Sequence, residues 1–184
     1  MSEEETPSLL IDANSLIDLI KLSMLIPVTE MADYHFLVTE EVIMEIKWPE
    51  QVRVLDASLQ NGMLRRISLS SLEELALFAR LHQILDLGEA ASLAYAAVNA
   101  CYLLSDETQG AFMREVRRHI GEKRLVRTAT LLAQTIDSHI VSVVDLSARL
   151  GLLRATAASS REKDDVEHLA RVLDRVKKLI SGGK

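Results

Sequence analysis

The fold is decided by residues 8–17, which read SLLIDANSLI. The apolar run Ser8 to Ile11 is typical of a buried strand, and it ends directly at Asp12. Residues 13–25 continue with helical spacing, and Pro27 is predicted to end that helix. A strand that passes through one acidic residue into a helix predicts the first unit of an α/β fold.

The rest of the chain repeats this alternation of strands and helices. Further strands are predicted over residues 35–38, 64–69, 101–105 and 124–127. Helices are predicted over residues 40–47, 52–59, 72–85, 89–100 and 107–119, and then on to residue 153, with Pro49 as an interruption. Strands separated by helices of this length indicate a parallel sheet with helices on both faces.

The C-terminal part of the chain has a different pattern. We expect one domain over residues 1–154, then a linker and an amphipathic helix over residues 155–184. The apolar positions of that helix follow a 3-4-3-4 spacing: Val166, Leu169, Leu173, Val176 and Ile180. Such a stripe either packs on the parent domain or binds a second copy or a partner protein.

Composition limits the function classes. The chain has 184 residues, 48% of them hydrophobic, and a net charge of −6, which argues mildly against tight, non-specific binding of nucleic acid. Cys101 has no second cysteine to pair with, so the expected location is the cytoplasm. No stretch approaches the roughly 20 apolar residues that span a bilayer, so no membrane association is expected.

Four acidic residues occupy positions that favour a shared site. Asp12 and Asp106 each follow a predicted strand directly, at the edge where open α/β sheets bind ligands. Glu45 borders the apolar face of its helix, and Glu89 begins a helix that is otherwise nearly all apolar. Each has a simpler explanation when taken alone: a helix cap for either aspartate, a solvated side chain for Glu45, and a helix-dipole partner for Glu89.

The four carboxylates together favour a metal site. Carboxylates that converge on one edge repel each other unless a cation lies among them. Mg²⁺ and Mn²⁺ prefer oxygen ligands, and such a site can activate water against a phosphodiester. The five histidines lack the spacing of zinc ligands, so a zinc site is not expected.

The same residues resemble a PIN domain. The resemblance covers roughly residues 8 to 154 and rests on four segments in this order: residues 9–17 (LLIDANSLI), 38–46 (VTEEVIMEI), 87–90 (LGEA) and 103–106 (LLSD). It implies a three-layer α/β/α fold with a five-stranded parallel sheet in the order 3-2-1-4-5. It also implies a Mg²⁺- or Mn²⁺-dependent nuclease, most often an endoribonuclease that cleaves RNA.

The resemblance implies roles for individual residues as well. Asp12, Glu45, Glu89 and Asp106 match the acidic quartet that is catalytic and binds the metal, and Asn14 and Ser105 match its supporting polar positions. Many members are the toxin of a toxin–antitoxin pair and form homodimers, so an antitoxin protein and a second copy are implied partners. Two departures are Glu89, where many toxins carry aspartate, and the additional C-terminal helix.

A basic stretch follows Asp106. It could guide a nucleic-acid backbone toward the metal, or it could be a solvated helix face; its residues are Arg114, Arg117, Arg118, Lys123, Arg124 and Arg127.

Two other functions compete with nuclease activity. The first is a catalytically weak or inactive binding or regulatory module that acts through a partner protein. The second is a phosphotransfer domain on a similar sheet; a haloacid-dehalogenase-type phosphatase would need an aspartate where this chain has Asn14, which argues against it.

Overall fold

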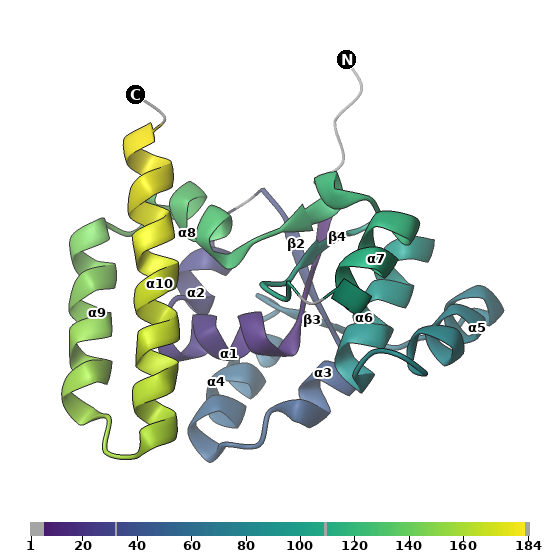
Figure 1. The fold of residues 1–184 in the computed structure, drawn as a ribbon, viewed down its shortest axis with the longest axis horizontal. Coiled ribbons are helices and arrows are strands. Elements are labelled where there is room, and N and C mark those ends of the chain that lie inside the picture. Colours follow the sequence, from purple (N-terminus) through teal and green to yellow (C-terminus); the bar gives the residue numbers. More distant parts are fainter. Residues whose placement is uncertain (1–5, 32, 109, 183–184) are drawn as a thin grey trace.

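Five parallel strands form the central sheet, in the order β3-β2-β1-β4-β5 (Figure 1). The computed structural model describes residues 6–31, 33–108 and 110–182. The strands are β1 (Ser8–Ile11), β2 (His35–Thr39), β3 (Arg65–Ile67), β4 (Tyr102–Leu104) and β5 (Leu125–Val126). The strand order and the parallel pairing confirm the predicted fold class.

Helices cover both faces of this sheet, which gives three layers. They are α1 (Ala13–Lys21), α2 (Leu25–Thr29), α3 (Glu40–Glu45), α4 (Pro49–Gln60), α5 (Leu72–Leu81), α6 (Leu87–Val98), α7 (Gly110–His119), α8 (Thr128–Asp137), α9 (Val143–Thr156) and α10 (Ser160–Gly182), with a 3₁₀ turn η1 (Glu122–Arg124). Within the described ranges, no helix is both long and apolar enough to cross a membrane.

Alternation along β1 divides the interior into two cores. Leu9 and Ile11 point to one face, where they pack with apolar side chains of α1, α2, α8, α9 and α10; we call this the α1 core. Leu10 points to the opposite face and packs with side chains of α5, α6 and α7, which we call the α6 core. β4 follows the same rule, because Leu104 belongs to the α1 core and Leu103 to the α6 core.

Two prolines lie differently from the prediction. Pro27 does not end the first helix; α1 already stops at Lys21, Ser23 adopts a positive φ of 53°, and Pro27 lies in the short helix α2. Pro49 does not interrupt a helix but begins α4. Both prolines lie in the first turn of a helix, where a backbone N–H has no partner within the helix and its loss costs little.

The C-terminal helix α10 packs on the same chain. It runs alongside α9 and contacts α8 (Figure 1). Four of the five stripe residues are buried in the α1 core, together with Val172, and Ile180 packs against it partly buried; the four are Val166, Leu169, Leu173 and Val176. Two polar contacts also tie it to α1: the Lys21 ammonium lies 2.6 Å from a carboxylate oxygen of Asp165, and the His168 ring lies 2.8 Å from Asp18. Of the two alternatives for this stripe, the structure supports packing in cis.

The packing of α10 predicts a large difference between two leucines of that helix. Leu169 is completely buried, whereas Leu179 is 48% exposed. Leu169→Ala should lower the free energy of unfolding by roughly 2–5 kcal/mol, the range for a buried leucine, because it leaves a cavity in the α1 core. Leu179→Ala is the matched control and should cost under about 1 kcal/mol. Urea unfolding measures both; equal effects of the two substitutions would contradict packing in cis.

Candidate metal centre

Asp12 is the most deeply buried acid at the carboxyl edge of the sheet. It follows β1, is only 3% exposed, and makes no capping hydrogen bond to α1 with its side chain. The Ser105 hydroxyl donates to its Oδ2 at 2.8 Å. Burial raises the pKa of Asp12 to about 6; the charge of Glu45 adds to the rise and the bond from Ser105 opposes it. The backbone amides of Ala13 and Asn14 also favour the ionised form, but the effect of burial on the pKa outweighs these contacts.

Glu45 is fixed to the helix that carries Glu89. The Gly88 amide, at the start of α6, donates to Oε1 of Glu45 at 2.9 Å. A Cβ on residue 88 would come within 2.5 Å of that oxygen, so only glycine allows this approach. The Leu87-Gly88-Glu89 turn thus positions two acids at once.

Glu89 is partly buried at the first turn of α6. The Asp86 amide donates to its Oε2 at 3.3 Å, which also gives Glu89 the helix-capping role that we considered as an alternative. Burial raises the pKa of Glu89 to about 7, and the charges of Asp12, Asp86 and Glu107 add to the rise. The charges of Glu45 and Glu89 therefore both act on Asp12, so the three predicted residues are neighbours. Among the described residues, however, their ligand atoms do not all lie within 4.8 Å of one another.

Asp106 points the other way. Its Oδ1 accepts a hydrogen bond from the Thr128 amide at 3.1 Å, and it lies with Asp18 and His168 on the side of the α1 core. The adjacent acid, Glu107, faces Glu89 instead, and the two line one small pocket of about 140 Å³. Asp106 is therefore the one predicted acid that lies apart from the other three, beside Asp18 and His168. Glu107 lies beside Glu89, and the sequence analysis did not identify it.

The alternation of side chains beyond the strand ends explains this arrangement. Leu104 faces the α1 core, so Ser105 faces α6, Asp106 faces α1, and Glu107 faces α6 again. The same alternation in β1 turns Asp12 toward α6, because Ile11 faces the α1 core. This alternation of side-chain direction can be read from the sequence, and it could have identified Glu107 as the acid that faces α6.

The two predicted supporting residues have different surroundings. Ser105 is completely buried; its hydroxyl donates to Asp12 and accepts a hydrogen bond from the Glu107 amide at 3.2 Å. It therefore joins the ends of β1 and β4. Asn14 is exposed in the first turn of α1.

The basic residues after Asp106 are divided between surface and structural contacts. Arg114, Arg117, Arg118 and Lys123 are exposed. Arg117 pairs with Glu122 at 2.5 Å. Arg124 is partly buried and donates to the backbone carbonyls of Ala96, Cys101, His119 and Ile120, so its guanidinium is already used inside the fold.

The donor atoms of these acids suit a hard divalent cation. We refer to Asp12, Glu45, Glu89 and Glu107 together as the acidic pocket: Glu89 and Glu107 line the small cavity, and Asp12 and Glu45 lie beside Glu89. All of its candidate ligand atoms are carboxylate oxygens, the donors that Mg²⁺ and Mn²⁺ prefer. Burial and mutual repulsion raise the pKa values of Asp12 and Glu89, which is the electrostatic cost that a bound cation would remove.

A comparison with family models identifies the family of this chain. A model described as a PIN domain matches residues 8–150, which is more than half of the chain. No curated protein and no solved structure matches the chain. The chain therefore belongs to the PIN-domain family, whose members are generally nucleases that use divalent metals.

The raised pKa values predict how stability depends on pH when metal is removed. The folded state binds the Asp12 proton more tightly than the unfolded state, because burial raises this pKa from 3.8 to about 6. The resulting stabilisation is present below about pH 4 and is lost as the pH rises through 6. The pKa of Glu89, raised from 4.5 to about 7, extends the loss toward pH 7.

Asp12→Asn should therefore flatten the fall in the free energy of unfolding between pH 4 and 6. Urea titrations in EDTA at several pH values measure this, with wild type as the reference. A slope as steep in the variant as in wild type would show that Asp12 does not titrate in this way.

Proposed function

Starting from membership of the PIN-domain family, we propose that this chain is a Mg²⁺- or Mn²⁺-dependent endoribonuclease that hydrolyses RNA phosphodiester bonds. The observation that carries the proposal is the buried Asp12 carboxylate, held by Ser105 and electrostatically coupled to Glu45 and Glu89. Asp12 is buried, Glu89 is partly buried and Glu45 is exposed. A buried carboxylate beside two further carboxylates is an unfavourable arrangement for a purely structural role. It is the arrangement expected of a cation site.

In this proposal, the metal ligands are Asp12, Glu45 and Glu89, and Glu107 takes the fourth position in place of Asp106. Glu107 is preferred because it shares a pocket with Glu89, whereas Asp106 lies on the side of the α1 core, with Asp18 and His168. Ser105 fixes the orientation of Asp12, and Gly88 fixes that of Glu45. A bound divalent cation would supply water activation and neutralise charge on the phosphate during hydrolysis, which yields a phosphate monoester and a free hydroxyl.

RNA is the proposed substrate partly because of the basic residues beside the pocket. α7 begins three residues after Glu107 and carries Arg114, Arg117 and Arg118 at its surface. Exposed cations next to an acidic site can hold a phosphate backbone while the cleaved bond lies over the metal. Lys123 extends this surface, whereas Arg124 is engaged in the fold.

Further parts of the proposal concern partners and location. A toxin role with an inhibitory antitoxin protein, and assembly as a homodimer, rest on the family resemblance. A cytoplasmic location rests on the single, unpaired Cys101. These parts are independent of the chemistry of the acidic pocket.

The test is cleavage of mixed RNA with Mn²⁺ or Mg²⁺ by matched variants. Asp12→Asn should reduce the rate on the order of 10²-fold or more, the scale for losing a group that stabilises transition-state charge. Glu107→Gln should reduce it far more than Asp106→Asn does, because only Glu107 faces the pocket.

Three results would contradict parts of this assignment. Equal activity of wild type and Asp12→Asn would overturn the nuclease proposal itself. A larger loss for Asp106→Asn than for Glu107→Gln would return the fourth position to Asp106. Cleavage of single-stranded DNA but not RNA would overturn the substrate.

A further inference from the structure

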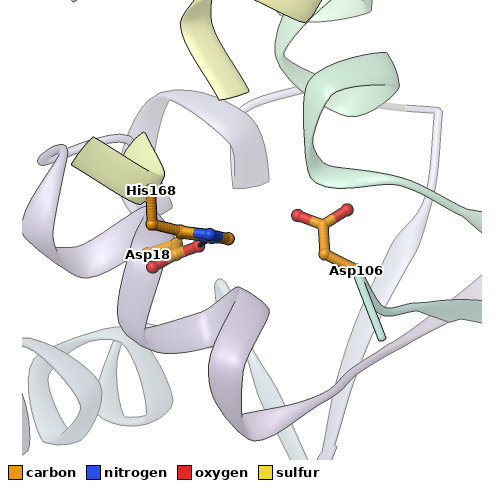
Figure 2. Close-up of side chains that lie close together, drawn as sticks. All are labelled: Asp18, Asp106 and His168. Carbon is orange, nitrogen blue, oxygen red and sulfur yellow. Dashed lines mark hydrogen bonds and ion pairs between the residues drawn. The ribbon is translucent and has the colours of Figure 1, made fainter. Parts of the chain in front are cut away.

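A second group of possible metal ligands lies on the other side of the β4 end. Asp18 belongs to α1, Asp106 to the segment after β4, and His168 to α10. One ligand atom from each lies within 4.8 Å of the others. Figure 2 shows the His168 ring beside Asp18, with its tip directed toward Asp106. We call these three residues the Asp18 cluster.

The hydrogen bonds within the Asp18 cluster do not satisfy all of its polar atoms. His168 and Asp18 bond at 2.8 Å, and one oxygen of Asp106 accepts from the Thr128 amide. The other oxygen, Oδ2 of Asp106, is buried without a hydrogen-bond partner, and so is the hydroxyl of Thr128, a fully buried residue. A buried carboxylate oxygen without a partner carries a large desolvation cost.

The charges of the Asp18 cluster are also unbalanced. Asp18 is 9% exposed and Asp106 is partly buried, so water screens these carboxylates poorly. One imidazolium can balance only one of two carboxylates. A divalent cation would balance both and would give Oδ2 of Asp106 a ligand bond.

The spacing suits direct coordination. Ligand atoms at about 2.1 Å from a metal are separated by about 3 to 4.2 Å, depending on the angle between them. Small side-chain rotations therefore close the Asp18 cluster on an ion. The His168 side chain is 43% exposed, which gives an ion a path from solvent.

The imidazole selects the type of ion. Mg²⁺ and Ca²⁺ take oxygen ligands, whereas an imidazole with two carboxylates favours Mn²⁺, Fe²⁺, Co²⁺ or Zn²⁺. This distinguishes the Asp18 cluster from the acidic pocket, whose candidate ligands are oxygens only.

We infer that Asp18, Asp106 and His168 bind a divalent transition-metal ion that fastens α10 to the segment carrying Ser105 and Glu107. His168 lies outside residues 8–150, the part that matches the family model, so this site depends on the additional helix of this chain. The ion would link three segments that are distant in sequence. It would thereby restrain the segment that supplies Glu107 to the acidic pocket.

Co²⁺ is the probe for this site, used with the untagged chain of residues 1–184. Imidazole bound to Co²⁺ gives strongly shifted proton NMR signals from the ring N–H, which carboxylate ligands cannot give. Wild type should show one such signal and a rise in Tm with Co²⁺. His168→Gln should lose both the signal and most of that rise.

Three variants serve as controls. Asp165→Asn removes the other polar tie between α10 and α1, and His35→Gln removes an exposed histidine; both should keep the signal. Asp12→Asn should also keep it, which separates this inference from the function of the acidic pocket. If His168→Gln does not fold, Asp106→Asn carries the same prediction, because it removes a ligand with almost no change in shape.

Two results would overturn the inference. Without a shifted signal in wild type at saturating Co²⁺, the Asp18 cluster is an ion pair only. If the signal persists in His168→Gln, another histidine binds the ion.

Discussion

The hydrogen bond from Ser105 to Asp12 is the contact on which the site depends. It joins the ends of β1 and β4, the two strands that meet at the centre of the sheet. It holds a carboxylate that is only 3% exposed and whose pKa burial has raised. The same hydroxyl accepts from the Glu107 amide and so sets the path of the chain toward α7. Ser105 thus orients the Asp12 carboxylate and also fixes the backbone of the segment that carries Glu107.

Much of this arrangement can be predicted from short segments of the sequence. The strand that ends at Asp12 and the one that ends at Ser105 were both recognisable from apolar runs, and parallel pairing brings their ends together. The helix predicted from residue 72 also begins there in the structure, where Ser71 and Glu74 form a capping box. Glu45 and Glu89 could be placed near the edge, but their connection through the Gly88 amide is a tertiary contact that spans 43 residues.

The features that the sequence did not reveal depend on direction and on distant contacts. Asp106 and Glu107 are neighbours, and only the alternation of side chains past Leu104 decides which of them faces α6. The stripe on α10 was visible, but a stripe does not identify the surface that it covers. The contact between His168 and Asp18 joins residues 150 positions apart, and no spacing rule within one element could predict it.

The central claim is that the acidic pocket binds a divalent cation through Asp12. A crystal grown with Mn²⁺, with diffraction recorded at the manganese absorption edge, tests this claim most directly. We predict an anomalous peak within coordination distance of the carboxylates of Asp12, Glu45 and Glu89, about 2.2 Å from its ligands. An ordered pocket with no anomalous peak at Asp12, in crystals soaked to saturation, would contradict the claim.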